Sequence, residues 1–235
     1  MPHLQSCWKK KFVKKKTNKP QFSSIPHRRF ERNCLAKEKN QLIAGCDEVG
    51  RGALAGPVVV AIVVWRPDIF LTTKKPKWAA EIKDSKLLSY QKRAELFPLI
   101  KKEAHSFALG IVSEKTIDKI NILEATKLAI CQATEKLNKK GVFFSTLLLD
   151  NLTIPSLPSS IKQKSLVKGD RRSFSIAAAS IIAKVSRDRM MEKWDAHYKP
   201  YDFSKNKGYG VAKHREALIR FGLSPIHRKT FVSDL

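Results

Sequence analysis

The sequence predicts an α/β fold with a mixed central sheet flanked by helices. Short apolar runs of strand length occur in the first half of the chain, and they are rich in β-branched residues. A long segment with helical apolar spacing separates these runs from two further ones, which is the alternation of an α/β domain. A second long segment, residues 175–194, has high helix propensity and a mostly apolar first half, as expected of a helix packed on a sheet.

Three strands are expected before the long helix. LIAGC (Leu42 to Cys46) and VVVAIVVW (Val58 to Trp65) are joined by a stretch rich in glycine and proline, so they are predicted to be adjacent. SFALGIVS (Ser106 to Ser113) is predicted to be the third strand, after a helix near Ser89 to Glu103 that is rich in Lys, Glu and Leu.

The long helix is predicted to begin at Asn121, which can act as its cap. Glu124 occupies the matching position of a capping box, and Gly141 lies just past the expected end. Apolar residues follow at helical spacing: Leu123, Ile130, Ala133 and Leu137.

Two more strands and the last helices complete the expected order. TLLLD (Thr146 to Asp150) and SLV (Ser165 to Val167) are short apolar runs. The first ends in Asp150, and the second is followed closely by Asp170. Beyond the helix at residues 175–194, basic loops alternate with one expected helix near Ala212 to Phe221. We see no internal repeat.

The charge balance indicates a polyanionic partner. The chain of 235 residues has 46 Lys and Arg against 21 Asp and Glu, a formal net charge of +25. This excess is far beyond what solubility requires, and nucleic acid is the first candidate. No apolar run approaches the roughly 18 residues of a membrane span.

The four cysteines, Cys7, Cys34, Cys46 and Cys131, form no CxxC pair and no spacing typical of zinc sites, so a reducing cytoplasm is expected. An organelle transit peptide is the alternative, because the first 40 residues are poor in acids; their lysine blocks and scarce early arginine argue against it.

Residues 1–38 are predicted to be a basic, flexible N-terminal arm, and residues 39–235 the folded domain. The arm contains KKKFVKKK, two prolines and no sustained apolar period. Two interpretations of the arm stay open: a solvated tail without a role, and a segment that binds phosphates.

Four carboxylates lie at or just after apolar runs: Asp47, Glu48, Asp150 and Asp170. Ligands of open α/β sheets gather in a crevice at strand ends, so these side chains are placed to meet. In a regular strand Asp47 and Glu48 point to opposite faces, so one site holds both only if the strand ends or bulges there. Oxygen-only ligands suit Mg²⁺ or Mn²⁺, although a single aspartate at a strand end is also a common cap or turn residue.

The segment GCDEVGRGALAGPVVV (Gly45 to Val60) resembles the signature of the ribonuclease HII family. Further segments resemble the family in the same order and cover nearly all of residues 42–231: IKDSKLLS, ALGIVSEKTIDKINILEAT, LLLDN, KGD, SIAAASIIAKVSRDRMM, NKGYGVAKH and SPIHRKTF. The resemblance implies a ribonuclease H-like fold with a C-terminal helical extension. It also implies that the same four carboxylates are catalytic ligands of Mn²⁺ or Mg²⁺.

The resemblance further implies how the substrate is read. Gly50, Arg51 and Gly52, together with Tyr209, would recognise the ribose 2′-hydroxyl, the group that distinguishes RNA from DNA. Lys86 and Lys184 would lie near the scissile phosphate. The alternative interpretation of both lysines is that they are solvated charges on helices. The implied reaction is hydrolysis on the 5′ side of a ribonucleotide, in RNA/DNA hybrids and at single ribonucleotides in duplex DNA, leaving 3′-hydroxyl and 5′-phosphate ends.

Four positions depart from the usual family pattern: Ala53, Leu87, Asn151 and Arg171. Arg171 is the most consequential, because a guanidinium beside Asp170 can contact phosphate or compete for the carboxylate.

Two alternatives remain. Ribonuclease HIII shares the fold, but residues 1–38 are too short and polar for its N-terminal domain. A non-catalytic nucleic-acid-binding protein would explain the charge but not the four carboxylates. The expected protein is a cytoplasmic monomer that acts on RNA/DNA hybrids and on ribonucleotide-containing duplex DNA, without a membrane partner.

Overall fold

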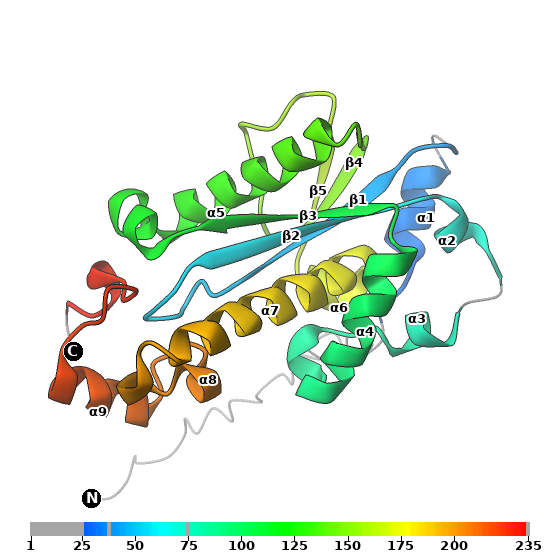
Figure 1. The fold of residues 1–235 in the computed structure, drawn as a ribbon. Coiled ribbons are helices and arrows are strands. Elements are labelled where there is room, and N and C mark those ends of the chain that lie inside the picture. Colours follow the sequence, from blue (N-terminus) through cyan, green and yellow to red (C-terminus); the bar gives the residue numbers. More distant parts are fainter. Residues whose placement is uncertain (1–25, 37–38, 74–75, 234–235) are drawn as a thin grey trace, which may run out of the picture.

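Five strands form one mixed sheet at the centre of the protein, in the order β3-β2-β1-β4-β5 (Figure 1). The computed structural model describes residues 26–36, 39–73 and 76–233. The strands are β1 (Ile43–Val49), β2 (Val58–Trp65), β3 (Ser106–Val112), β4 (Thr146–Asp150) and β5 (Lys162–Leu166). β1, β2 and β3 are antiparallel neighbours, whereas β4 and β5 run parallel to β1, which confirms the mixed sheet.

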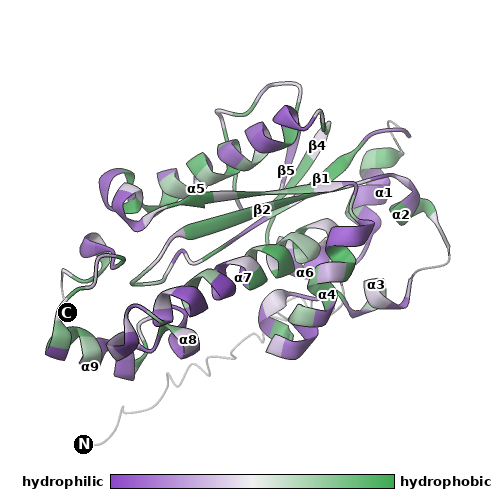
Figure 2. Cartoon of the chain, in the orientation of Figure 1, coloured by the Kyte–Doolittle hydropathy of each residue, from purple (hydrophilic) through white to green (hydrophobic). Residues whose placement is uncertain are grey.

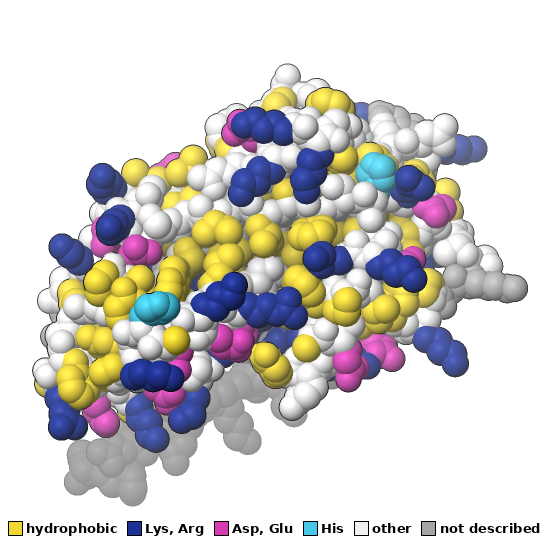
Figure 3. All heavy atoms as spheres, viewed as in Figure 1, with side chains coloured by type: hydrophobic (Ala, Val, Ile, Leu, Met, Phe, Trp, Pro, Cys, Tyr) yellow, Lys and Arg dark blue, Asp and Glu magenta, His cyan; other side chains and the backbone are white. Residues whose placement is uncertain are grey.

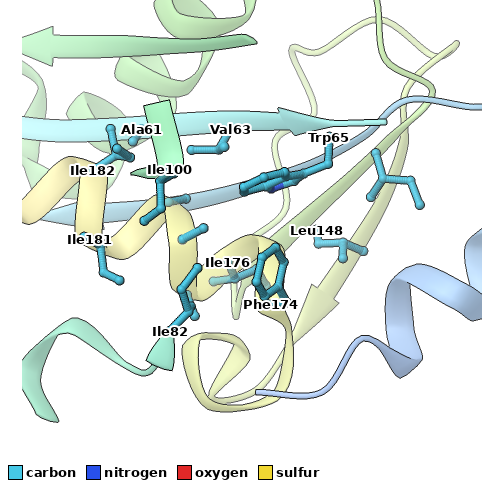
Figure 4. Packing of buried hydrophobic residues seen from close by; sticks show 14 of the residues in the cluster. Ala61, Val63, Trp65, Ile82, Ile100, Leu148, Phe174, Ile176, Ile181 and Ile182 are labelled. Carbon is cyan, nitrogen blue, oxygen red and sulfur yellow. The ribbon is translucent and has the colours of Figure 1, made fainter. Parts of the chain in front are cut away.

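Strand β2 is buried on both faces, which explains its continuous apolar sequence. Its side chains alternate: Ala61, Val63 and Trp65 belong to the core beneath α7 (Phe174–Asp195), and Val60, Ile62 and Val64 to the core beneath α5 (Glu114–Lys139). Figure 4 shows the α7 core, where Trp65 packs against Phe174 with ring centroids 5.1 Å apart. The two long helices therefore cover opposite faces of the sheet (Figure 1).

Helix α5 begins seven residues before the predicted start. Ser113 caps it by accepting a hydrogen bond from the amide of Thr116. Asn121 interrupts the helix with φ 63°, and its side-chain oxygen accepts bonds from the amides of Leu123 and Glu124. Asn121 thus caps the helical residues that follow it, as predicted, but residues 114–120 before it are also helical.

The remaining helices are mostly short. They are α1 (Arg29–Leu35), α2 (Asp68–Leu71), α3 (Lys77–Glu81), α4 (Tyr90–Glu103), α6 (Gly169–Arg172), α8 (Phe203–Asn206) and α9 (Ala212–Phe221), with 3-10 turns at Ser85–Leu87, Lys199–Tyr201 and Lys229–Phe231. Figure 2 shows the apolar character concentrated in β2 and in the stretches of helix that face the sheet. Helices α4, α7 and α9 lie where the sequence predicts them; β5 begins three residues earlier than expected and ends one residue earlier.

Helix α1 departs from the expectation of a flexible arm over residues 1–38. Its Glu31 is fully buried and accepts hydrogen bonds from the hydroxyl of Ser173 (2.6 Å) and the amide of Ser175 (2.9 Å) at the start of α7. Arg28 and Arg32 also donate to the carbonyls of Ile69 and Phe70, and Cys34 and Leu35 pack in the α7 core. Mostly polar contacts to distant backbone thus attach this segment, and they leave no apolar period in the sequence. Residues 1–25 and 37–38 lie outside the described residues.

A third, smaller core joins residues 198–232, which we call the C-terminal segment, to the loop after β1. It contains Leu54 and Ala55 from that loop, Met191 from α7, and Tyr201, Phe203, Ala217, Leu218 and Ile226 from the C-terminal segment. Among the described residues, Cys34, Cys46 and Cys131 are free thiols, and no helix is long and apolar enough to cross a membrane. Cys7 lies outside the described residues.

Candidate functional site

A cleft of about 280 Å³ lies where β1 ends between α7 and the C-terminal segment. Six of the predicted site residues line it: Asp47, Glu48, Lys86, Asp170, Lys184 and Tyr209. Val49, Asp84, Ser85 and Ser180 complete the lining. Residues from five separate stretches of the chain thus converge on one crevice.

Asp47 and Glu48 share the cleft although β1 neither ends nor bulges at them. Their pairing with β2 is regular and continues to Val49. Pairing with β4, however, stops at Cys46, so one edge of β1 is open beyond that point. The open edge lets a single cleft reach residues of both faces, which replaces the predicted bulge.

Asp150 and Asp170 are joined through the backbone of Gly169. Asp150 ends β4, and its Oδ1 accepts a hydrogen bond from the Gly169 amide at 2.8 Å. Asp170 lies in α6, which follows β5 after Lys168 in the left-handed conformation (φ 55°). Asp150 is therefore beside the cleft lining rather than part of it.

Burial and the charges of neighbouring carboxylates raise the pKa of three acids in the cleft. Burial raises the pKa of Asp47 well above its usual value, and the charges of Glu48, Asp170 and Asp150 add to this effect. Burial and the charges of Asp84 and Asp150 raise the pKa of Asp170 to about 6. Burial also raises the pKa of Glu48, against the effect of Arg51. The cleft therefore concentrates negative charge that a cation would neutralise.

Three basic side chains at or near the cleft are paired with acids. Lys184 donates to Asp188 at 2.8 Å, and Arg51 donates to Glu48 at 3.1 Å. Arg171, whose side chain is 41% exposed, donates to Asp84 at 3.2 Å, and its charge also acts to lower the pKa of Asp170. The arginine that departs from the family pattern thus forms its ion pair with Asp84 while its charge also acts on Asp170.

Asp84 is the site residue that the sequence reasoning missed. It is 2% exposed, accepts a hydrogen bond from the amide of Lys86 and is the leading charge effect on Asp170. It is also the only acid in the segment IKDSKLLS, of which Lys86 was the predicted site residue. An acid between two lysines, Lys83 and Lys86, was the sequence feature that could have identified Asp84 as a site residue.

The donor set suits a hard divalent cation, because it consists of carboxylate oxygens that repel one another. Within the described ranges, no group of three or more His, Cys, Asp or Glu side chains is arranged so that it could hold a metal ion as it stands. Oxygens of Asp150 and Glu48 are engaged with Gly169 and Arg51. Each bond takes one oxygen of its carboxylate, and the second oxygen can still bind an ion.

Gly50, Arg51 and Gly52 adjoin the cleft through the Arg51–Glu48 pair, and Arg51 and Gly52 are exposed. Tyr209 faces two cations, with the Lys184 ammonium 5.8 Å and the Arg187 guanidinium 5.5 Å from its ring centre. The predicted reader residues thus border the same crevice as the carboxylates.

The backbone of Tyr209 is held by a buried histidine pair. His214 Nδ1 lies 2.9 Å from the Tyr209 carbonyl, and His214 Nε2 lies 3.0 Å from His227 Nε2. The amide of Ser224 donates to His227 Nδ1 at 2.8 Å. Because an amide can only donate, this Nδ1 has no proton; His227 then donates from Nε2 to His214, which donates from Nδ1 to Tyr209.

Both rings are therefore neutral, and we expect acid to destabilise the fold through them. Burial and the neighbouring His214 lower the pKa of His227 from 6.5 to about 4. Since the folded value is below the unfolded one, stability is complete above pH 6.5 and is lost as pH falls toward 4, by up to about 3 kcal/mol. Thermal melts across this range should show a steeper loss for the wild type than for His227→Asn. Equal slopes would contradict the neutral pair.

Comparisons with known proteins agree on one family. The family model described as Ribonuclease HII matches residues 44–233. A ribonuclease HII of Caldanaerobacter subterraneus is 46% identical over 92% of this chain and 84% of its own length, and that of Bacillus subtilis 44% identical over 97% and 83%. The crystal structure of ribonuclease H2 from Pyrococcus horikoshii has a TM-score of 0.61 at 25% identity, covering 80% of this chain and 93% of its own. The chain belongs to the ribonuclease HII family.

Proposed function

We propose that this protein hydrolyses the RNA strand of RNA/DNA hybrids and nicks duplex DNA on the 5′ side of a single ribonucleotide, leaving 3′-hydroxyl and 5′-phosphate ends. The observation that carries this proposal is the cleft in which Asp47, Glu48 and Asp170 face Lys86, Lys184 and Tyr209. Acids that bind a cation, bases that bind phosphate and an aromatic ring for a sugar are the groups this reaction requires.

In the proposed mechanism Asp47, Glu48, Asp150 and Asp170 would hold Mg²⁺ or Mn²⁺. The chemistry supplied by such ions there would be activation of water and stabilisation of the leaving oxygen of the phosphodiester. Lys86 and Lys184 orient the scissile phosphate. Because Lys184 is paired with Asp188, it is held at a defined position on α7.

Ribose recognition is proposed for Gly50, Arg51 and Gly52, with Tyr209 packing against the neighbouring sugar. A side chain at Gly52 would meet nothing within 4 Å in the free protein. The space beside Gly52 is therefore available to a substrate, and the sugar can approach the Gly52 backbone closely.

The test is cleavage of a labelled DNA duplex with one ribonucleotide, in Mg²⁺, Mn²⁺ or chelator, with the product ends mapped. A metal-dependent nick on the 5′ side of the ribonucleotide is expected. Cleavage only of longer RNA tracts would contradict single-ribonucleotide recognition, and intact binding without cleavage would favour a non-catalytic role.

The basic surface is proposed to hold the nucleic-acid backbone, and the protein is proposed to act as a cytoplasmic monomer. Lys and Arg side chains are spread over the face shown in Figure 3. Residues 1–25 add seven lysines and no acid.

We expect deletion of residues 1–25 to weaken duplex binding without moving the cut. The slope of log affinity against log salt should become shallower by up to about six, because each neutralised phosphate contributes roughly 0.9. Binding titrations between low and moderate salt would measure this slope, and end mapping would check the cut. Helix α1 stays in this variant because Glu31 anchors it to α7. A displaced cut site would overturn this role for the segment.

A further inference from the structure

Within the C-terminal segment, residues 224–228 lie close to both groups proposed to read the ribose, Gly50–Gly52 and Tyr209. We call Gly50–Gly52 the reader loop. Ala55 in the stretch after this loop forms an isolated bridge with His227, and the amide of Arg228 donates to Leu54 at 2.8 Å. The proposed function gives this segment no role.

Arg228 is fully buried and bonds the backbone of this loop and of the stretch that follows it. Its Nη2 donates to the Gly50 carbonyl at 2.7 Å, its Nη1 to the Arg51 carbonyl at 2.9 Å, and its Nε to the Gly56 carbonyl at 2.9 Å. All three nitrogens of the guanidinium thus hold carbonyls. A lysine ammonium in the same place lacks the planar fork that makes these bonds together.

These bonds decide where the loop's amides point. In a trans peptide the carbonyl of one residue and the amide N–H of the next point in opposite directions. With the Gly50 and Arg51 carbonyls turned inward to Arg228, the amides of Arg51 and Gly52 are turned outward, at residues that are exposed. Outward amides beside the cleft are suited to a hydroxyl oxygen.

The residue before Arg228 acts on the other half of the reader. His227 holds His214, which donates to the Tyr209 carbonyl. The halves are also joined directly, because the amide of Leu54 donates to the Gly208 carbonyl at 2.8 Å. The reader loop and Tyr209 therefore form one unit supported by the adjacent buried residues His227 and Arg228; Arg187 also holds the flanking stretches through the carbonyls of Ala55 and Lys207.

We propose that His227 and Arg228 are the positioning residues of the ribose reader: Arg228 turns the amides of Arg51 and Gly52 toward the 2′-hydroxyl, and His227, through His214, fixes the backbone of Tyr209. This inference rests on the proposed function, which assigns the reader loop and Tyr209 to the ribose. It gives a role to an arginine at a fully buried position, where a charge is costly.

The histidine half is tested with a matched pair of variants. In His214→Asn the side-chain amide can replace Nδ1 and still donate to Tyr209, whereas in His214→Gln the amide replaces Nε2 and reaches only His227. We expect His214→Gln to lower kcat/KM on a duplex with one ribonucleotide about 10-fold. His214→Asn should stay within about 2-fold of the wild type, and affinity for all-DNA duplex should be unchanged in both.

A double-mutant cycle separates positioning from a general structural role. In a Tyr209→Ala background, His214→Gln should cause no further loss, because the ring that it positions is absent. An additive loss, or equal losses in the two His214 variants, would overturn the proposal.

The arginine half is tested with Arg228→Lys, which keeps the charge but not the fork. We expect a fall in kcat/KM of about 10-fold or more on the single-ribonucleotide duplex, with unchanged affinity for all-DNA duplex. Unchanged kcat/KM in folded Arg228→Lys would overturn the proposal; should this variant not fold, the His214 pair decides. A wild type that cleaves nothing would instead overturn the proposed function, and this inference with it.

Discussion

Replacing Asp47 with Asn should abolish cleavage while leaving hybrid binding intact. Asp47 is the carboxylate on which the other three act most directly, since its pKa is raised by burial and by Glu48, Asp170 and Asp150. Removing one ligand of a catalytic cation costs several kcal/mol of transition-state stabilisation, so a loss on the order of 1,000-fold in kcat is expected. Single-turnover cleavage and gel-shift binding of a labelled hybrid would measure the two effects separately.

Two readouts keep this result from being mistaken for misfolding. Without divalent metal, Asp47→Asn should melt at the same temperature as the wild type or higher, because a repelled buried charge is removed. Added Mn²⁺ should raise the melting temperature of the wild type more than that of the variant. Glu135→Gln removes an exposed acid on α5 and serves as the charge control. Wild-type cleavage by Asp47→Asn would exclude Asp47 as a ligand.

Replacing Gly45 with Ala should destabilise the fold strongly. An added Cβ would lie 2.1 Å from the carbonyl carbon of Ser175 and 2.6 Å from the amide nitrogen of Ile176. Both are backbone atoms of α7, so the helix must move away from β1. Overpacking costs typically 1–3 kcal/mol where side chains can adjust, and more is expected here because backbone must shift: about 3 kcal/mol or above. Denaturant unfolding would measure the change.

The matched control is Gly52→Ala, whose Cβ would meet nothing within 4 Å and whose φ is not in the left-handed region. It should unfold within about 0.5 kcal/mol of the wild type. Equal stability of Gly45→Ala and Gly52→Ala would show that α7 does not lie so closely on β1.

Several elements were predictable because their signals are local. The β-branched run of β2, the alternation of helices and strands, and the apolar first half of α7 each follow from neighbouring residues. Asn121 was recognised because its side chain caps the residues directly after it. The part of the helix before Asn121 was missed; it starts at Glu114, seven residues earlier, with Ser113 as its cap.

What the sequence by itself determined is the order of the elements, the basic character and, through the long resemblance, the family and its four candidate carboxylates. The tertiary structure alone decided which polar groups meet: Asp84 with Arg171, Glu31 with Ser173, and Arg228 with the reader loop, which is 178 residues away at Gly50. The physical reason is that a strand or helix is specified by residues a few positions apart, whereas a hydrogen bond or ion pair between distant residues leaves no periodic trace in either partner. Such bonds depend on where the packed core brings distant backbone together, and here they support the surface that we propose reads the ribose.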